Sequence, residues 1–192
     1  MIHDKSRDGW FGGSDTRFIV GNWNTKTFRD WFMTKLGIVQ NNIETRQMNA
    51  GTHKEGQILD FISPFVEKDK QIRIPELLLR VNLDGNIGKH IIEVKTHSAD
   101  KPFKVSKAYW QQIQVQMFGY GTTDGEIVSY GLTEEDYRNY FLPIDAERLI
   151  HHPISYDKAW VEQTYLPRLK RLAECLKEGR MPDEAFGEDS RR

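Results

Sequence analysis

The stretch IIEVKTH, residues 91–97, combines the pattern of a buried strand with two charged side chains that could do chemistry. Its apolar members favour burial, whereas Glu93 and Lys95 carry opposite charges and lie two residues apart. In a strand this spacing places both side chains on the same face. The pattern therefore brings a carboxylate and an ammonium group to one place on an otherwise apolar strand.

Two further carboxylates are expected to approach this strand. The runs on either side of the turn DGNIG predict an antiparallel hairpin, which brings Asp84, at the end of the first strand, close to Glu93. Glu55 comes from a predicted helix ahead of the hairpin. Convergent carboxylates repel one another unless a cation lies among them, and Mg²⁺ takes oxygen ligands of this kind. Lys95 beside them could orient or deprotonate a water next to a phosphodiester, so these residues indicate a metal-dependent phosphodiesterase site.

Each of these residues also has an ordinary structural interpretation. Alternating charges such as Glu93 and Lys95 form salt-bridge pairs on many solvent-facing strands, and Asp84 before a glycine is typical of a turn. Glu55 shares the apolar side of its helix, where a carboxylate without a partner is costly to bury, and this favours a metal-binding role. The nuclease interpretation depends on the combination of the apolar flanks, the LDG motif and the acidic helix.

The elements that must position these residues follow from the spacing of apolar residues. A short helix is expected after a Gly-Gly turn, with Ser14 or Asp15 as its N-cap and Gly21 at its end. Longer helices are predicted over residues 25–36, 51–65, 106–118 and 157–177, and strands around the hairpin turn and over residues 126–132 and 147–155. This order indicates an α/β or α+β sheet with flanking helices.

Composition limits the class of protein. The chain has 192 residues, 38% hydrophobic and 29% charged, which fits one soluble domain over residues 1–180 followed by a flexible tail over residues 181–192. We expect no membrane span, no signal peptide and residence in the cytoplasm, because the chain has no run of eighteen apolar residues and its N-terminus is charged. The single cysteine, Cys175, excludes a disulfide framework or a Cys-ligated cluster within one chain. The net charge of −1 disfavours non-specific coating of DNA but allows a narrow channel lined by a few cations.

The motifs and their order resemble the phage-type exonucleases of the YqaJ and lambda-exonuclease group, within the PD-(D/E)XK superfamily. The stretches that carry the resemblance are RDGWFGGSDTRFIVG, GTHKEGQILDFI, LDG followed by IIEVKT, YWQQIQVQMFGYG and LKEGRMPD. Two departures are the run Val81-Asn82-Leu83 before Asp84, which removes one possible phosphate contact, and the stretch VEKDKQIRIPELLLR, which fits poorly. The resemblance implies an α/β fold of the restriction-endonuclease type, a central mixed sheet flanked by helices.

The resemblance also implies a metal site. Asp84 and Glu93 would bind Mg²⁺ together with the carbonyl of Val94, and Glu55 would hold or approach a second ion. Two ions are expected, with Mn²⁺ able to substitute. Lys95 would position the attacking water.

Further residues implied by the resemblance would contact phosphate. Gln112 would order Lys95 or a phosphate, and Arg7 and Ser14 would contact a terminal 5′-phosphate, where a helix N-terminus favours an anion. Ser14 could instead be a plain N-cap, and Arg7 a solvated side chain near the terminus. Gln112 shares a helix face with another glutamine, which makes a poor core face and favours a role at the site.

The activity implied by the resemblance is a Mg²⁺-dependent deoxyribonuclease that degrades linear double-stranded DNA ends from 5′ to 3′ and yields single strands for phage recombination. A single-strand annealing protein and a homotrimer are implied as partners, and residence in the host cytoplasm if the protein is phage-encoded. Two alternatives stay open: an endonuclease or flap-trimming enzyme of the same fold, and a non-catalytic DNA-binding or inhibitor protein. The intact set of Asp84, Glu93 and Lys95 speaks against the last.

Overall fold

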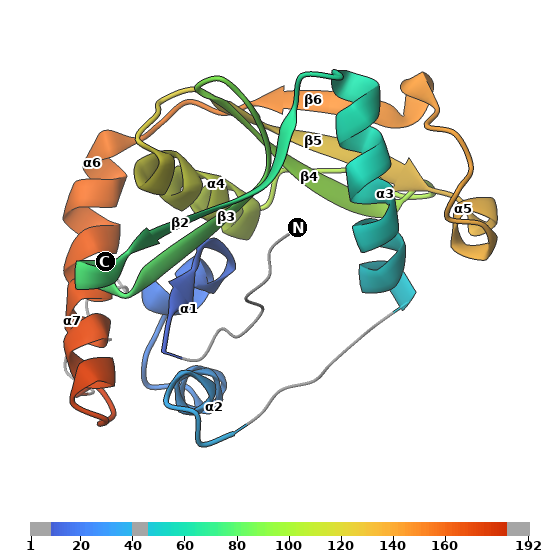
Figure 1. The fold of residues 1–192 in the computed structure, drawn as a ribbon. Coiled ribbons are helices and arrows are strands. Elements are labelled where there is room, and N and C mark those ends of the chain that lie inside the picture. Colours follow the sequence, from blue (N-terminus) through green and yellow to red (C-terminus); the bar gives the residue numbers. More distant parts are fainter. Residues whose placement is uncertain (1–8, 40–45, 184–192) are drawn as a thin grey trace.

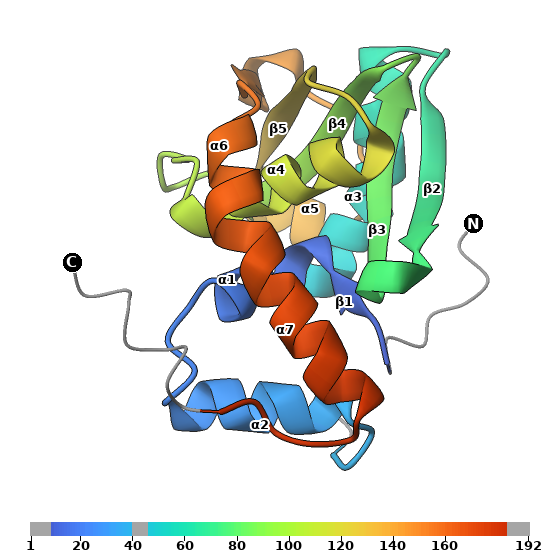
Figure 2. The ribbon, with the colours of Figure 1, turned by 90° about the vertical axis from the view of Figure 1, so that its left-hand side faces the viewer.

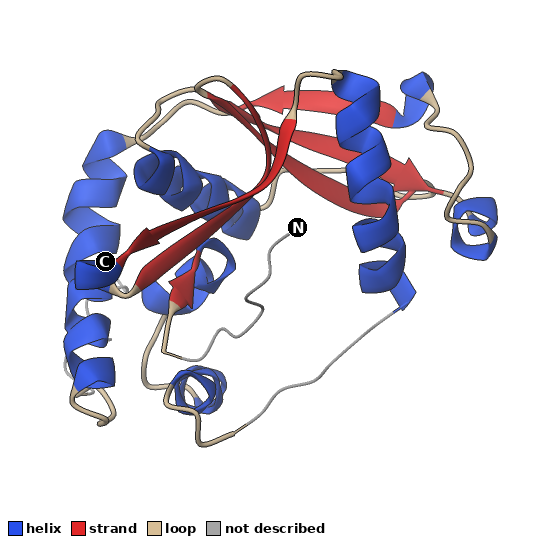
Figure 3. Ribbon diagram, in the orientation of Figure 1, coloured by secondary structure: helices blue, strands red, loops and turns tan. Residues whose placement is uncertain are grey.

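The structure is a computed structural model that describes residues 9–39 and 46–183 (Figure 1). Arg7 and most of the tail predicted over residues 181–192 lie outside the described residues. Within the described ranges the chain forms one mixed sheet with helices on both faces (Figure 3). This confirms the α/β class, with a central mixed sheet flanked by helices, that the sequence predicts.

The sheet has the order β1-β3-β4-β5-β6, and β2 pairs with β3 outside this path. Its strands are β1 (Phe11–Gly12), β2 (Glu67–Ile74), β3 (Leu79–Ile87), β4 (His90–Ser98), β5 (Gly125–Leu132) and β6 (Leu149–Pro153). The β1–β3 and β4–β5 pairs are parallel, and the β2–β3, β3–β4 and β5–β6 pairs are antiparallel. The ladders that join β4 to β5 and β5 to β6 run without a break.

The helices form two layers (Figures 1 and 2). They are α1 (Thr16–Ile19), α2 (Lys26–Lys35), α3 (Arg46–Ile62), α4 (Lys107–Tyr120), α5 (Glu134–Arg138), α6 (Lys158–Trp160) and α7 (Leu166–Lys177), with a π-helical turn (Val161–Tyr165) joining α6 to α7. Helix α4, with α1, α2, α6 and α7 around it, covers one face, and α3 with α5 covers the other. Within the described ranges, no helix combines the length and apolar character that crossing a membrane requires.

Alternate residues of the central strands enter two separate apolar cores. Ile91 of β4 and Ile127 of β5 belong to the larger core, which also contains residues of α4 and α7. Ile92 and Val128 belong to the smaller core under α3. Because side chains alternate along a strand, Glu93 shares the face of Ile91 and is directed to the side of α4. Glu93 and Lys95, two residues apart, therefore lie on the same face of β4, as the sequence predicts.

The hairpin turn lies further along the chain than the sequence predicts. Strand β3 continues through Asp84 to Ile87, and the turn consists of Gly88 and Lys89. Gly88 has a φ of 56°, a value that glycine adopts without strain. The side chain of Asn86 is buried and donates to the Gly88 carbonyl at 3.1 Å. The prediction that Asp84 ends its strand is wrong, because the Asp84-Gly85 pair lies within β3 and not in the turn.

The first helical turn also differs from the expectation. A 3₁₀ turn (Gly13–Asp15) precedes α1, so Ser14 lies within that turn instead of capping a helix. Asp15 stands at the N-cap position of α1, as one predicted alternative has it, but its carboxylate accepts from the Gly12 N–H at 2.7 Å and pairs with Lys35 at 2.6 Å. The Asp15 carboxylate thus links Lys35 of α2 to the backbone of Gly12 in β1 and does not cap α1.

Strand β2 is an element that the sequence did not reveal. It occupies the stretch that fits no motif, and it pairs with β3 from the Glu67–Asn86 pair to the Ile74–Leu79 pair. Its run EKDKQIRI carries charges at successive positions, which hides the alternation of a half-buried strand. Charged residues of this kind are typical of strands at the margin of a sheet, where they discourage pairing with other chains.

Gly85 offers a test of how closely α3 packs on the hairpin. A Cβ atom at this position would lie 2.6 Å from Val66 Cγ1 and 2.7 Å from Leu59 Cδ2. We expect Gly85→Ala to lower the free energy of unfolding by about 1–3 kcal/mol through overpacking. The matched control is Gly56→Ala on α3, where nothing lies within 4 Å of the added atom; it should raise stability by about 0.5–1 kcal/mol. Urea unfolding measures both, and equal effects of the two variants would contradict the packing described.

Candidate functional site

The candidate site lies where β3 changes partners. On the edge opposite β2, β3 pairs with β1 at its beginning and with β4 only from Gly85 to Ile87. Residues 81–84 lie between these two ladders, because β4 turns away to pair along its length with β5. Asp84 bridges the divergence, since its Oδ2 accepts from the backbone N–H of Val94 at 2.8 Å. A carboxylate thus takes the position where a backbone ladder would otherwise continue.

A pocket of about 570 Å³ opens at this divergence. It collects residues from the start of β1–α1, from α3, from β2, β3 and β4, and from α4. The sequence-predicted site residues that line it are Ser14, Glu55, Asp84, Glu93, Val94, Lys95 and Gln112. The structure therefore brings together all the sequence-predicted site residues that it describes, and Arg7 lies outside the described ranges.

Glu93 is the most tightly held group of the site. Its side chain is almost fully buried, and Lys95 Nζ forms an ion pair with its Oε1. The amide groups of Gln112 and Gln116, one turn apart on α4, donate to Oε1 and Oε2 respectively. Buried carboxylates are tolerated only when they are paired and hydrogen-bonded in this way. The surface salt-bridge interpretation of the Glu-x-Lys pair is therefore wrong, because both partners face a helix instead of solvent.

Gln116 is the other glutamine on the same helix face as Gln112, and it was not among the predicted site residues. Besides Glu93, its amide donates to the backbone carbonyl of Asn82 at 3.1 Å, which lies between the two ladders of β3. Its position four residues after Gln112 puts both side chains on the same face of α4, and that spacing was the available signal. The two glutamines connect the diverging strands to one helix.

Lys95 keeps its charge in this setting. Burial by itself would lower the pKa of its ammonium group, but the negative charges of Glu93 and Asp84 outweigh burial and raise the pKa above its usual value. The ammonium also lies 5.2 Å from the centre of the Tyr109 ring, a cation–π distance. A lysine held in its charged form can donate hydrogen bonds and offset negative charge.

The remaining carboxylates of the pocket repel one another. Burial, together with the charges of Glu93 and Asp69, raises the pKa of Glu55 to about 7. Burial and the charges of Glu93 and Glu55 raise the pKa of Asp84 well above its usual value. Asp69, on β2, also lines the pocket and has a φ of 56°, an unusual conformation for a non-glycine residue. Asp69 was not among the predicted site residues, because β2 itself was not predicted.

The donor set fits a hard divalent cation. Four carboxylates line one pocket, at Glu55, Asp69, Asp84 and Glu93. Burial and neighbouring negative charges raise the pKa of Glu55 and of Asp84, so the negative charge of these two groups is poorly compensated. Among the described residues, no three His, Cys, Asp or Glu side chains come close enough together to enclose a metal ion. Mg²⁺ usually needs only one or two carboxylates, with waters and substrate phosphate completing its shell. The pocket therefore provides oxygen ligands for such an ion without forming a closed cage.

The helix N-terminus on which the predicted phosphate contacts depended is not present in the expected form. Ser14 lines the pocket and is exposed. However, α1 spans only Thr16–Ile19, so a helix dipole adds little there. A second cation was not predicted: Arg80 of β3 is buried and lines the same pocket. Arg80 lies opposite Gly12 of β1 in the parallel ladder. Because this ladder joins segments far apart in the chain, only the tertiary structure shows that Arg80 belongs to the pocket.

Solved structures of two exonucleases share this fold. The alkaline exonuclease LHK-Exo from Laribacter hongkongensis is 19% identical, and its structure matches with a TM-score of 0.67 over 90% of each chain; its complex with dAMP matches with a TM-score of 0.68. The phage-related exonuclease from Haemophilus somnus 129PT is 15% identical, with a TM-score of 0.67 over 88% of this chain and 95% of the other.

No protein-family model matches this sequence, and no curated protein matches it. At these levels of identity the structural matches show the fold alone. They confirm the α/β fold that the motifs led us to expect, and they show a likeness in fold to an alkaline exonuclease and a phage-related exonuclease.

The raised pKa of Glu55 predicts the pH dependence of stability in metal-free protein. The group has a pKa of about 7 when folded against 4.5 in its ordinary state. Between these pH values the folded state binds more protons, so the free energy of unfolding should fall as the pH rises from about 4.5 to about 7. Glu55 would contribute on the order of 2 kcal/mol to this fall.

Urea unfolding after removal of divalent ions, at about pH 5 and pH 8, measures this effect. Glu55→Gln should flatten the dependence, although Asp84 keeps part of it. The control, Glu162→Gln, removes an exposed carboxylate and should leave the wild-type slope. If Glu55→Gln has the same slope as wild type, the electrostatic description of the pocket is wrong.

Proposed function

We propose that this chain is a divalent-metal-dependent DNA exonuclease that degrades linear duplex ends from 5′ to 3′ and leaves single strands for phage-type recombination. The observation that carries the proposal is the meeting of Asp84, Glu93 and Lys95 in one pocket, joined by Glu55 from a separate helix. The fold shared with an alkaline exonuclease and a phage-related exonuclease supports the choice of a nuclease over other hydrolases.

The metal ligands in this proposal are the pocket's oxygen donors. Asp84, Glu93 and the carbonyl of Val94 would hold one Mg²⁺ or Mn²⁺ ion, and Glu55 would hold or approach a second. Such ions, when bound, supply Lewis-acid stabilisation of the charge on the phosphate and lower the pKa of a bound water. The poorly compensated negative charge described above is the physical reason for cations to enter the pocket.

The protein's own groups position the reactants. Hydrolysis forms a bond from a water oxygen to phosphorus and breaks the bond from phosphorus to a sugar oxygen, which leaves with a proton. Lys95, held in its charged form, donates hydrogen bonds to the water or to a phosphate oxygen and offsets the developing negative charge. Gln112 and Gln116 hold the Glu93 carboxylate in one orientation. These hydrogen bonds would keep the carboxylate in place when Lys95 turns toward the substrate.

The duplex end would be recognised through its terminal phosphate. Ser14, Arg7 and the newly found Arg80 supply a hydroxyl and two guanidinium groups, which suit an anion. An annealing protein that takes up the single strands, and a homotrimer that encircles the duplex, complete the proposal.

Lys95→Ala is the first test of the mechanism. Because the variant loses the cation that offsets transition-state charge, we expect kcat on linear duplex DNA to fall about 10²–10⁴-fold. The assay follows the release of nucleotides from linear duplex with Mg²⁺ present. Undiminished cleavage by the purified variant would contradict the mechanism, and nicking of a closed circular plasmid by wild-type protein would favour an endonuclease.

The phosphate contacts predict a preference for 5′-phosphorylated ends. Wild-type protein should degrade 5′-phosphorylated duplex faster than 5′-hydroxyl duplex, and Ser14→Ala should reduce the preference by about 1 kcal/mol, the typical net contribution of one hydrogen bond. Rates on the two substrates, measured side by side, give the ratio directly. Equal rates with wild-type protein would rule out the terminal phosphate pocket while leaving the nuclease assignment in place.

A further inference from the structure

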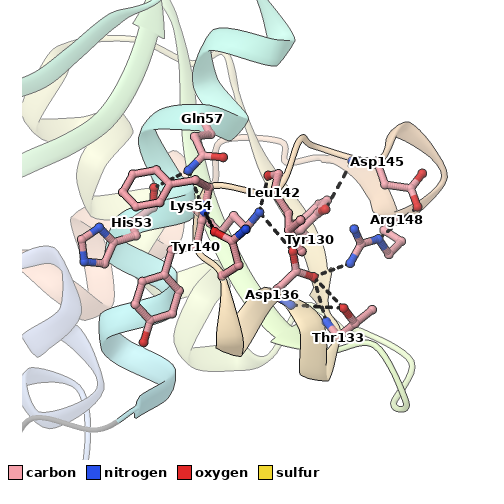
Figure 4. Close-up of polar contacts among 12 residues, drawn as sticks. His53, Lys54, Gln57, Tyr130, Thr133, Asp136, Tyr140, Leu142, Asp145 and Arg148 are labelled. Carbon is pink, nitrogen blue, oxygen red and sulfur yellow. Dashed lines mark hydrogen bonds and ion pairs between the residues drawn. The ribbon is translucent and has the colours of Figure 1, made fainter.

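Helix α3 presents two different faces near Glu55. Met48, Gly51, Thr52 and Glu55 are spaced three and four residues apart and all line the pocket. The other face, which carries Lys54 and its neighbours, contacts residues 133–148, between β5 and β6 (Figure 4). We call residues 133–148 the clamp segment. It includes helix α5 and the loop that leads to β6.

Three side chains of α3 contact the clamp segment. Lys54 is fully buried, and its Nζ lies 3.0 Å from Asp136 Oδ1 and donates to the Leu142 carbonyl at 2.6 Å. Gln57 donates from Nε2 to the Tyr140 carbonyl at 2.7 Å. The ring of His53 stacks on Tyr140, with centroids 4.8 Å apart and planes 9° apart. The three residues that make these contacts lie within two positions of Glu55 in the chain.

The clamp segment is itself fixed to the sheet through Asp136. The Oδ2 atom of this carboxylate accepts from the backbone N–H of Thr133 at 2.9 Å and pairs with Arg148. Arg148 in turn donates to the carbonyl of Gly131 in β5 at 3.1 Å. Lys54 therefore connects α3, through one buried carboxylate, to the strand next to β4.

A buried ion pair of this kind is better suited to fixing geometry than to adding stability. Withdrawing an ammonium group from water costs several kcal/mol, and the attraction to its partner does little more than offset that cost. An apolar side chain of similar length would fill the same space. However, an apolar contact tolerates sliding and rotation, whereas the Lys54 Nζ atom must stay within reach of Asp136 and of the Leu142 carbonyl.

We propose that Lys54 is a positioning residue for Glu55: its pairing with Asp136 sets the rotation and height of α3 and so places the Glu55 carboxylate in the pocket with Asp84 and Glu93. The assignment rests on the proposed nuclease function for its catalytic consequence. Its structural part, the placement of an oxygen donor for a divalent ion, can be measured without DNA.

Lys54→Met is the variant that tests the proposal. It should fold, because Asp136 keeps Arg148 and Thr133 as partners. We expect its affinity for Mn²⁺, measured by calorimetry without DNA, to fall about 10-fold, as is typical when a group that orients a metal ligand is lost. On linear duplex, kcat should fall about 10–100-fold with little change in KM. Gln57→Ala, which removes the hydrogen bond to the Tyr140 carbonyl and a longer one to the His53 carbonyl, should shift both quantities less and in the same direction.

The matched control is Leu172→Ala on α7, a fully buried residue of the other core. It should lose about 2–5 kcal/mol of stability while keeping the wild-type Mn²⁺ affinity and kcat per folded molecule. Wild-type Mn²⁺ affinity and kcat in Lys54→Met would overturn the positioning role. If wild-type protein fails to cleave DNA, the proposed function fails. The Mn²⁺ affinities of Lys54→Met and of its control Leu172→Ala still decide whether Lys54 positions Glu55.

Discussion

The site depends on one constraint in the sheet: β3 pairs with β4 for only a few residues before the two strands diverge. The backbone groups along the divergence still need partners, because buried unpaired N–H and C=O groups are costly. Asp84 accepts from the Val94 N–H, and Gln116 donates to the Asn82 carbonyl. Polar side chains thus replace ladder hydrogen bonds. The groups that satisfy the backbone are the same groups that line the pocket, so fold and site cannot be separated.

Electrostatics follows from this arrangement. The divergence admits carboxylates from β2, β3, β4 and α3 into one half-buried pocket, where Lys95 supplies a single ammonium group close to Glu93. Burial strengthens their mutual repulsion, which is why the pKa values of Glu55 and Asp84 rise. The folded chain therefore holds negative charge at a cost, which the divalent cation of the proposed function would offset. The charges of Glu93 and Asp84 raise the pKa of Lys95 in spite of its burial and keep the side chain positively charged.

The two helical layers support the site in different ways. Helix α4 contacts the sheet through a large apolar core and holds Glu93 directly with Gln112 and Gln116. Helix α3 has a smaller core beneath it and is joined to the clamp segment by polar contacts around Lys54. Rigid placement of catalytic groups requires packing or hydrogen bonds behind them. The α4 layer supplies packing, and the α3 layer supplies the buried ion pair.

The sequence by itself determined the residue types of the site and their local placement. Periodicity placed Glu93 and Lys95 on one face of a strand and Gln112 on a helix, because side-chain direction within an element depends only on its repeat. It did not reveal β2, the burial of Asn86 beside the turn, Asp69, Arg80, Gln116 or the Lys54–Asp136 pair. Each of these depends on contacts between segments far apart in the chain, and local propensity does not specify which strands pair or where they diverge. The sequence predicted that Glu55, Asp84 and Glu93 approach one another, but only the tertiary structure shows that Asp69 joins them in a pocket where β3 and β4 diverge.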